Sequence, residues 1–249
     1  MSLTLGRRER TALLAQREVG RLFAPLWVPL LSALMRWGFG WRIEGISQLR
    51  REYARLRAQP GPLLLCANHL TMLDSFVIAW ALGSPLFYLR HYAALPWNTP
   101  ERRNFASTRW KRMLVYVMKC VPLRRGAARR EVAGALARVA HLLGRGEALL
   151  VFPEGARSRS GRVDVDSAAY GVGRLILAVP GCRVLCIYLR GRGQTTWSDA
   201  PRRGERFRGE LSCFEPKSDH AGVRGSVDVA RQIVTRLAGM ERRHFDGRQ

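Results

Sequence analysis

Residues 63 to 75 read Leu-Leu-Leu-Cys-Ala-Asn-His-Leu-Thr-Met-Leu-Asp-Ser, an apolar run that passes directly into polar residues. A short apolar run bounded by turn residues is typical of a buried β-strand. Asp74 and Ser75 are common residue types at the start of a helix, and the apolar residues after them predict a helix over 74–82. His69 is therefore predicted to lie in a turn between a strand and a helix.

The same turn contains an N-H-x4-D element, formed by Asn68, His69 and Asp74. Within one continuous helix, positions i and i+5 point to different faces, so this pair needs the turn in order to meet. An imidazole that is oriented by a carboxylate can take a proton from a hydroxyl group. The spacing alone also fits an ordinary loop histidine beside an aspartate that caps a helix.

A second motif lies about eighty residues further along the chain. Residues 149 to 161 read Leu-Leu-Val-Phe-Pro-Glu-Gly-Ala-Arg-Ser-Arg-Ser-Gly, again an apolar run followed by a turn. Gly155 would let a ligand approach the backbone closely, and the planar guanidinium of Arg157 matches the oxygens of a phosphate. The pattern indicates an anion-binding turn, with an ordinary polar turn as the alternative.

Together, the two motifs resemble the glycerolipid acyltransferase family, which is typified by bacterial 1-acylglycerol-3-phosphate acyltransferases. Residues 152–161 differ from the usual family sequence only at Ala156, where threonine is common. The resemblance covers residues 60 to 190, and the motifs follow one another in the same order as in the family. It departs from the family at Arg124, which replaces an acid before the phosphate-contacting arginine, and in the strand over 184–189, which lacks the usual proline.

This resemblance implies an enzyme that moves a fatty acyl chain from a thioester, acyl-CoA or acyl carrier protein, to a hydroxyl of a lysolipid such as 1-acylglycerol-3-phosphate. His69 would be the general base, Asp74 would orient its imidazole, and Asn68 would shape the turn. No metal or redox cofactor is expected. The residues expected to bind the acceptor are Arg125, Glu154, Gly155, Arg157 and Arg159. For the Glu154 carboxyl, hydrogen bonds from acceptor hydroxyls, hydrogen bonds from neighbouring amides and a general-acid role all remain open.

The departures at Arg124 and Ala156 leave the acceptor open. The alternative is the same transfer to a hydroxyl on a molecule without a phosphate, such as a lyso-ornithine lipid, a glycan, or a specialised aryl or polyene lipid.

The chain carries 42 Lys and Arg against 19 Asp and Glu in 249 residues, a net charge of +23. Such a protein is attracted to polyanions, either an anionic membrane surface or a nucleic acid. Because the sequence has no zinc-finger, RNP or helix-turn-helix signature, nucleic-acid binding is a distant alternative and no specific nucleic acid is expected as a partner. The basic residues between 101 and 130 would attract anionic lipid or an acidic acyl carrier protein.

Residues 22–35 are uncharged and largely apolar but shorter than the 20 or so residues that span a bilayer. Pro25 and Pro29 are predicted to interrupt them, and nearby tryptophans suit the headgroup region. We expect residues 22–41 to lie in the membrane interface, with a buried core helix as the alternative. The five cysteines show no C-x2-C pairing, which favours buried thiols in a reducing compartment over a metal site. The expected location is the cytoplasmic face of the inner membrane, as a peripheral or monotopic protein.

Predicted strands alternate with predicted helices along the chain, so the expected fold class is α/β, with a mostly parallel sheet flanked by helices. Residues 1–45, beginning with a charged helix over 1–21, would form a membrane-associated helical segment, and 46–249 the catalytic domain. The predicted strands are 62–67, 148–152 and 183–189, and the predicted helices are 74–82, 128–143, 167–179 and 226–238.

Overall fold

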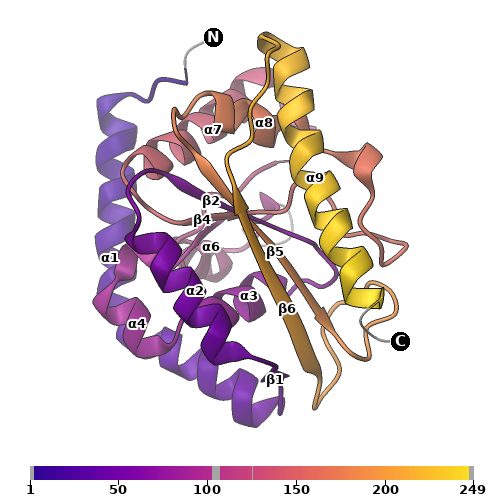
Figure 1. Ribbon diagram of the computed structural model, residues 1–249. Coiled ribbons are helices and arrows are strands. Elements are labelled where there is room, and N and C mark those ends of the chain that lie inside the picture. The colour runs from indigo at the N-terminus through magenta and orange to yellow at the C-terminus, as the bar shows by residue number, and fades with distance from the viewer. Residues whose placement is uncertain (1–2, 103–106, 125, 247–249) are drawn as a thin grey trace.

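The computed structural model describes residues 3–102, 107–124 and 126–246, and it shows an α/β fold (Figure 1). Within these residues, six strands form one sheet in the order β1-β6-β5-β2-β4-β3. The β5 and β6 strands pair antiparallel, and the other neighbouring strands pair parallel. The predicted mostly parallel sheet flanked by helices is confirmed.

The strands and helices have the following bounds. The strands are β1 (Arg42–Ile43), β2 (Leu63–Ala67), β3 (Trp97–Asn98), β4 (Leu149–Val151), β5 (Arg183–Gly191) and β6 (Arg206–Phe214). The helices are α1 (Arg7–Ala33), α2 (Ile46–Ala58), α3 (Asp74–Leu82), α4 (Pro85–Arg90), α6 (Arg109–Val117), α7 (Arg129–Gly144), α8 (Tyr170–Leu177) and α9 (Gly222–Asp246). Each strand and helix predicted over residues 62–238 is present, and α9 is longer at both ends than the predicted 226–238.

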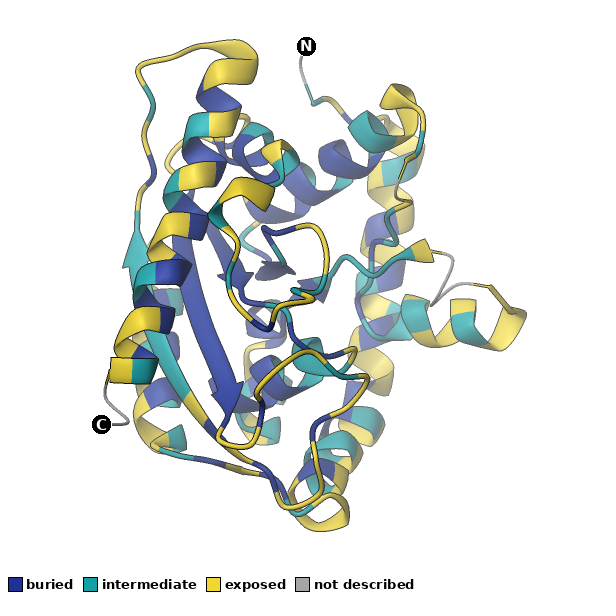
Figure 2. Ribbon diagram, turned by 90° about the vertical axis from the view of Figure 1, so that its right-hand side faces the viewer, coloured by how far each residue is buried: buried dark blue, intermediate teal, exposed yellow. Residues whose placement is uncertain are grey.

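The β2 strand divides the core into two clusters, because its successive side chains point to opposite faces of the sheet. Leu64 and Cys66 belong to the cluster that α7, α8 and α9 cover. Leu63, Leu65 and Ala67 belong to the cluster that α1, α2, α3 and α4 cover. All five residues are fully buried, as Figure 2 shows for the centre of the sheet. A strand buried on both faces explains the continuous apolar run in the sequence.

The N-terminal region differs from the prediction of a charged helix followed by a segment broken at Pro25 and Pro29. The α1 helix runs through both prolines and continues into a π-helical turn at Leu34–Gly38. A proline removes the hydrogen bond to the carbonyl four residues earlier, here those of Arg21 and Pro25. Because Arg21 and Pro25 lie on the exposed side of α1, these carbonyls can bond water, and packing of the opposite side holds the helix straight enough to continue.

A buried polar cluster fastens α1 to the sheet. The Glu147 carboxylate, just before β4, accepts hydrogen bonds from Arg17 Nε of α1 at 2.6 Å, Lys119 Nζ at 2.7 Å and Trp97 Nε1 at 2.9 Å. Lys119 is fully buried and also donates to the carbonyls of Tyr92 and Leu95. Burial lowers the pKa of Lys119 to about 8. Such a network is costly to break, because each charge would be left buried without its partner.

Candidate active site

The turn between β2 and α3 brings His69 and Asp74 together. His69 Nδ1 lies 3.0 Å from Asp74 Oδ2. Asp74 is the first residue of α3, whereas His69 lies two residues beyond the end of β2. The turn that the five-residue spacing requires is therefore present.

The Asp74 carboxylate is held by more than the imidazole. Its Oδ2 also accepts hydrogen bonds from the backbone amides of Leu70 at 2.6 Å and Thr71 at 2.7 Å, and Oδ1 accepts one from Thr71 Oγ1 at 2.6 Å. These donors stabilise the ionised carboxylate and fix its direction. A carboxylate facing Nδ1 favours the tautomer with the proton on Nδ1, which leaves Nε2 free to accept a proton.

The His69 ring is fixed from the side as well. It stacks on Phe152, with ring centroids 3.9 Å apart and an interplanar angle of 13°. Asn68 is buried and pairs with the β5 backbone: Nδ2 donates to Leu189 O at 3.0 Å, and Oδ1 accepts from Leu189 N at 2.8 Å. The side chain of Asn68 thus continues the sheet for one residue after β2 and sets where the turn begins.

A groove of about 1300 Å³ opens beside His69. Its apolar wall comes from α6, α7, α8 and the strand ends, and includes Leu114, Met118, Leu136, Val139, Phe152, Val172 and Leu175. Its lining also contains six basic residues and three acids among the described residues: Arg102, Lys111, Arg124, Arg130, Arg138 and Arg157, with Glu9, Glu101 and Glu131. The groove therefore offers an apolar surface and a set of positive charges within reach of one imidazole.

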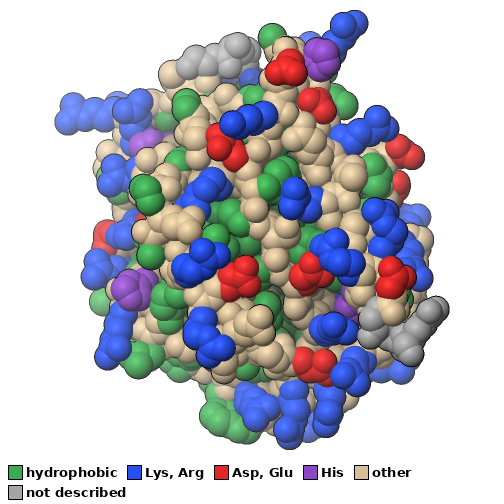
Figure 3. All heavy atoms as spheres, viewed as in Figure 1, with side chains coloured by type: hydrophobic (Ala, Val, Ile, Leu, Met, Phe, Trp, Pro, Cys, Tyr) green, Lys and Arg blue, Asp and Glu red, His purple; other side chains and the backbone are tan. Residues whose placement is uncertain are grey.

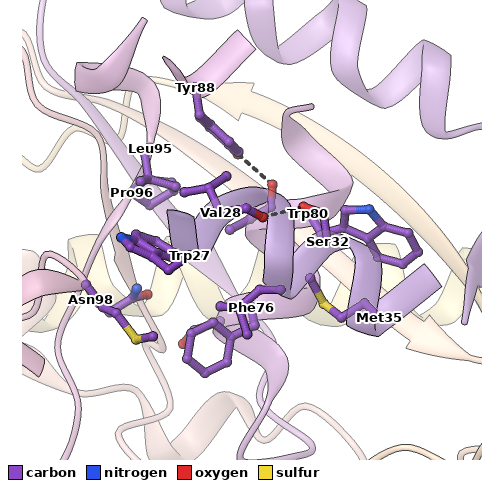
Figure 4. Close-up of a pocket in the computed structure, with 14 residues that line it drawn as sticks. Trp27, Val28, Ser32, Met35, Phe76, Trp80, Tyr88, Leu95, Pro96 and Asn98 are labelled. Carbon is purple, nitrogen blue, oxygen red and sulfur yellow. Dashed lines mark hydrogen bonds between the residues drawn. The ribbon is translucent and has the colours of Figure 1, made fainter. Parts of the chain in front are cut away.

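A small recess of about 30 Å³ lies between α1 and α3 and shares Ser75, Phe76, Asn98 and Met118 with the lining of the groove. Figure 4 shows the side chains of α1 and α3 that meet around it, among them Trp27 and Phe76. Trp27 Nε1 and Asn98 Oδ1 have no protein partner among the described residues. The recess has the size and the polar groups to hold a single water molecule.

Glu154 is buried and does not line the groove, although its neighbour Gly155 does. The amide of Asp164 donates to Glu154 Oε2 at 3.4 Å, and the backbone of His69 also hydrogen-bonds the carboxyl. Burial, which outweighs these two amides, raises the pKa of Glu154 to about 7, with a further contribution from Glu241. This placement favours hydrogen bonds to neighbouring amides, one of the roles that the sequence left open.

The raised pKa of Glu154 predicts a pH dependence of stability. The pKa of this carboxyl rises from 4.5 in the unfolded chain to about 7 in the folded protein. It therefore does not lower the free energy of unfolding below pH 4.5, and it lowers it increasingly between pH 4.5 and about pH 7. The full decrease is on the order of 3 kcal/mol. Glu154→Gln, which mimics the neutral form, should therefore gain thermal stability relative to the wild type between pH 5 and pH 8. Unfolding curves at four pH values measure this difference, and a difference that does not change with pH would contradict the assignment.

The other predicted acceptor-binding residues differ in their placement. Gly155 has a φ of +69° and lines the groove, which explains a glycine at this turn. Arg157 also lines the groove, and its Nη1 lies 3.0 Å from Asp199 Oδ1. Arg159 is exposed and does not line the groove. Arg125 lies outside the described residues, and its neighbour Arg124 lines the groove, 3.8 Å from Glu131.

Three residues that the sequence analysis did not single out, Thr71, Ser198 and Asp199, form hydrogen bonds with residues of the turn that carries His69 and Asp74. Thr71 bonds the Asp74 carboxylate, Ser198 N donates to Leu70 O at 3.1 Å, and Met72 N donates to Asp199 O at 3.1 Å. Within the described ranges, no cluster of three or more His, Cys, Asp or Glu side chains could hold a metal ion.

Comparison with known proteins shows which family the chain belongs to. The model of the family described as Acyltransferase matches residues 42–190, more than half of the chain. The chain belongs to the Acyltransferase family. The resemblance drawn from the two motifs is thus confirmed, and so is the prediction of an acyl-transferring enzyme. The matched region includes both His69 and the turn that carries Arg157.

Among solved structures, the acyltransferase is similar to the crystal structure of the 1-acyl-sn-glycerophosphate (LPA) acyltransferase, PlsC, from Thermotoga maritima. The TM-score is 0.46 and the sequence identity 15%, and the match covers 95% of this chain and 84% of that chain. No curated protein matches the sequence.

Proposed function

We propose that this acyltransferase moves a fatty acyl chain from acyl-CoA or acyl carrier protein to a hydroxyl of a lysolipid such as 1-acylglycerol-3-phosphate. The observation that carries this proposal is the His69–Asp74 pair, which opens onto a groove with both an apolar wall and basic side chains. The apolar wall suits an acyl chain. The basic side chains suit the phosphates of coenzyme A or of a phosphopantetheine arm, as well as a phosphate on the acceptor.

In the proposed reaction, His69 Nε2 takes the proton of the acceptor hydroxyl as its oxygen attacks the thioester carbonyl. The C–O bond forms, the C–S bond breaks, and the departing thiolate takes the proton back from the imidazolium. Asp74 holds the imidazole in place and stabilises its charged form. The two substrates react directly in this scheme, which uses no metal or redox cofactor.

An acyl-enzyme formed on cysteine is less well supported by the groove. Cys120 lines the groove, but burial raises the pKa of its thiol to about 12. The thiolate is the nucleophilic form of cysteine, and a thiol with this pKa supplies almost none of it near neutral pH. This favours His69 acting on the substrate hydroxyl.

Arg157 is well placed to hold a negatively charged acceptor headgroup, because it lines the groove and its neighbour Ser158 donates its backbone N–H to His69 O at 3.0 Å. Arg157→Ala should therefore raise the KM for 1-acylglycerol-3-phosphate at least about tenfold, as expected when a charged hydrogen bond is lost. Arg159→Ala, which removes an arginine of the same motif outside the groove, should change KM much less. Initial rates at varied acceptor concentration measure both. Equal KM values for wild type and Arg157→Ala would remove Arg157 from the acceptor site.

A second candidate acceptor is a hydroxyl lipid or glycan without a phosphate. It is favoured by a specific observation: Arg157 already has an ionic partner, the carboxylate of Asp199. Comparing acceptors with and without a phosphate distinguishes the two candidates.

We also propose that α1 attaches the enzyme to an anionic membrane surface. The segment Arg7–Gly38 is the one helix, among the described residues, that is long and apolar enough to cross a membrane. One side of α1 packs on the core, whereas the opposite side exposes Leu22, Phe23, Leu26 and Leu30, followed by Leu34 and Trp37 in the π-helical turn. A helix that is buried along one side and apolar along the other suits adsorption to the membrane interface better than a span.

Basic residues surround the end of this apolar surface. The segments 36–42 and 202–206 lie side by side, since Gly204 N donates to Phe39 O and Trp41 Nε1 donates to Arg202 O. They expose Arg36, Arg42, Arg202, Arg203 and Arg206. Figure 3 shows basic side chains gathered at the lower edge of the molecule, where β1 and the end of α1 lie in Figure 1. Arginines beside an exposed tryptophan suit an anionic headgroup region.

The five free cysteines fit a reducing compartment, which favours the cytoplasmic face.

Changing Leu26 and Leu30 to serine should weaken binding to vesicles of phosphatidylglycerol and phosphatidylcholine at least about tenfold, because two exposed apolar side chains no longer enter the lipid. The matched control changes Val223 and Val227, which are exposed on α9, to serine, and it should leave binding unchanged. Cosedimentation measures the bound fraction. Loss of binding in both double variants, or in neither, would contradict attachment through α1.

A further inference from the structure

The loop between β5 and β6 contacts the turn that carries His69. Ser198 N donates to Leu70 O, and Met72 N donates to Asp199 O, both at 3.1 Å. This part of the loop lies beyond residue 190, where the family match ends. Two backbone hydrogen bonds therefore fix residues 198 and 199 relative to the turn.

Arg190, at the end of β5, fastens the base of the same loop. Its guanidinium is fully buried and donates to the carbonyls of Gln194 at 2.9 Å, Thr195 at 3.0 Å and Gly161 at 2.5 Å. Gly161 belongs to the second motif, so Arg190 joins that motif to the loop. A buried guanidinium with several carbonyl partners is a rigid connection. Arg190 thus holds the loop at residues 194 and 195, and the hydrogen bond from Met72 holds the backbone of Asp199.

Asp199 presents its carboxylate to Arg157. Arg157 Nη1 lies 3.0 Å from Asp199 Oδ1 and 3.4 Å from Ser198 O, and the guanidinium lies over the ring of Trp197 at 5.0 Å from its centroid. Both polar contacts use the same terminal nitrogen. The remaining edge of a planar guanidinium can still bind an anion, but that anion would lie close to the Asp199 carboxylate.

We propose that Asp199 determines the charge selectivity of the acceptor site: its carboxylate partly neutralises Arg157 and weakens binding of a phosphate monoester relative to a headgroup without a phosphate. The inference rests on the proposed function, because it takes Arg157 as the residue that holds the acceptor headgroup. Like charges a few ångströms apart repel even at a high dielectric constant, so a second negative charge at this guanidinium is disfavoured. The side chain of Asp199 is 78% exposed, which makes the effect moderate in size.

The test compares wild type with three variants. Asp199→Asn removes the charge and keeps the shape, and Asp199→Glu keeps the charge. Glu210→Gln is the matched control, because Glu210 forms an ion pair with Arg243 away from the groove and this change alters the net charge by the same amount. The acceptors are 1-acylglycerol-3-phosphate and monoacylglycerol, which differ by the phosphate. Binding of glycerol 3-phosphate by calorimetry adds a measurement that does not depend on turnover.

Asp199→Asn should raise kcat/KM for the phosphate acceptor relative to monoacylglycerol about fivefold, mainly through a lower KM, and should bind glycerol 3-phosphate about fivefold more tightly. Glu210→Gln should match the wild type in both measurements, and Asp199→Glu, which keeps the negative charge, should favour the phosphate acceptor less than Asp199→Asn does. An unchanged ratio in Asp199→Asn would overturn the proposal. If the wild type acylates neither acceptor, the proposed function fails, and calorimetry decides on Asp199 alone: equal binding by wild type and Asp199→Asn, or no binding by either, overturns the inference.

Discussion

Replacing His69 by alanine should lower the kcat of acyl transfer by about 10²- to 10⁴-fold, the range over which a positioned general base accelerates a reaction. His69 lines the groove, and its Nδ1 is engaged by Asp74, so the ring offers Nε2 to the acceptor hydroxyl. The side chain is mostly buried, with 17% exposed, but the turn keeps the three hydrogen bonds that Leu70 and Thr71 donate to Asp74, so loss of the ring should leave the fold and membrane binding intact. Turnover with a thioester and a lysolipid measures the effect.

The matched control for this change is His220→Ala, which removes an exposed histidine that does not line the groove. It should retain full activity. Circular dichroism and vesicle cosedimentation establish that His69→Ala is folded and attached to lipid. A folded His69→Ala variant with normal turnover would show that another group removes the hydroxyl proton.

Replacing Asp74 by asparagine should lower kcat by at least about a hundredfold, because a neutral amide cannot stabilise the imidazolium that forms when His69 takes a proton. The turn can survive this change: the amide oxygen can accept the three N–H bonds of Asp74 Oδ2, and the amide nitrogen can donate to Thr71 Oγ1. The KM for the acceptor should therefore change little. A steady-state comparison separates kcat from KM.

Thr71→Ser is the companion variant, because it keeps the hydroxyl that bonds Asp74 and should stay near wild-type activity. If Asp74→Asn raised KM and left kcat unchanged, the carboxylate would serve to shape the groove and would have no part in proton transfer.

Local sequence patterns predicted the centre of this fold well. The strands β2, β4 and β5 are buried on both faces, and their apolar runs are visible without any other information. The shorter and outer strands could not be found in this way. The β6 strand mixes arginine, glutamate and glycine with apolar residues because most of it is only partly buried, and β1 and β3 are two residues long.

The candidate site was predictable where it depends on neighbours in sequence. His69 and Asp74 are five residues apart, and one turn is enough to join them. The contacts of Arg157 and Glu154 depend on residues far along the chain. Asp199 follows Arg157 by 42 residues, and Glu241 lies on α9. The sequence contains these residues but does not show that the β5–β6 loop folds back over the His69 turn.

The central claim is that His69 activates an acceptor hydroxyl for direct attack on an acyl thioester. The most direct measurement incubates purified enzyme with acyl-CoA or acyl carrier protein and a panel of lysolipids, and identifies products by mass spectrometry. The account predicts a lysolipid carrying one additional ester-linked chain and an equal amount of free thiol, both formed at least about a hundredfold more slowly with His69→Ala. Release of free fatty acid without an acylated lipid, or an equal rate of lipid acylation by folded His69→Ala, would contradict it.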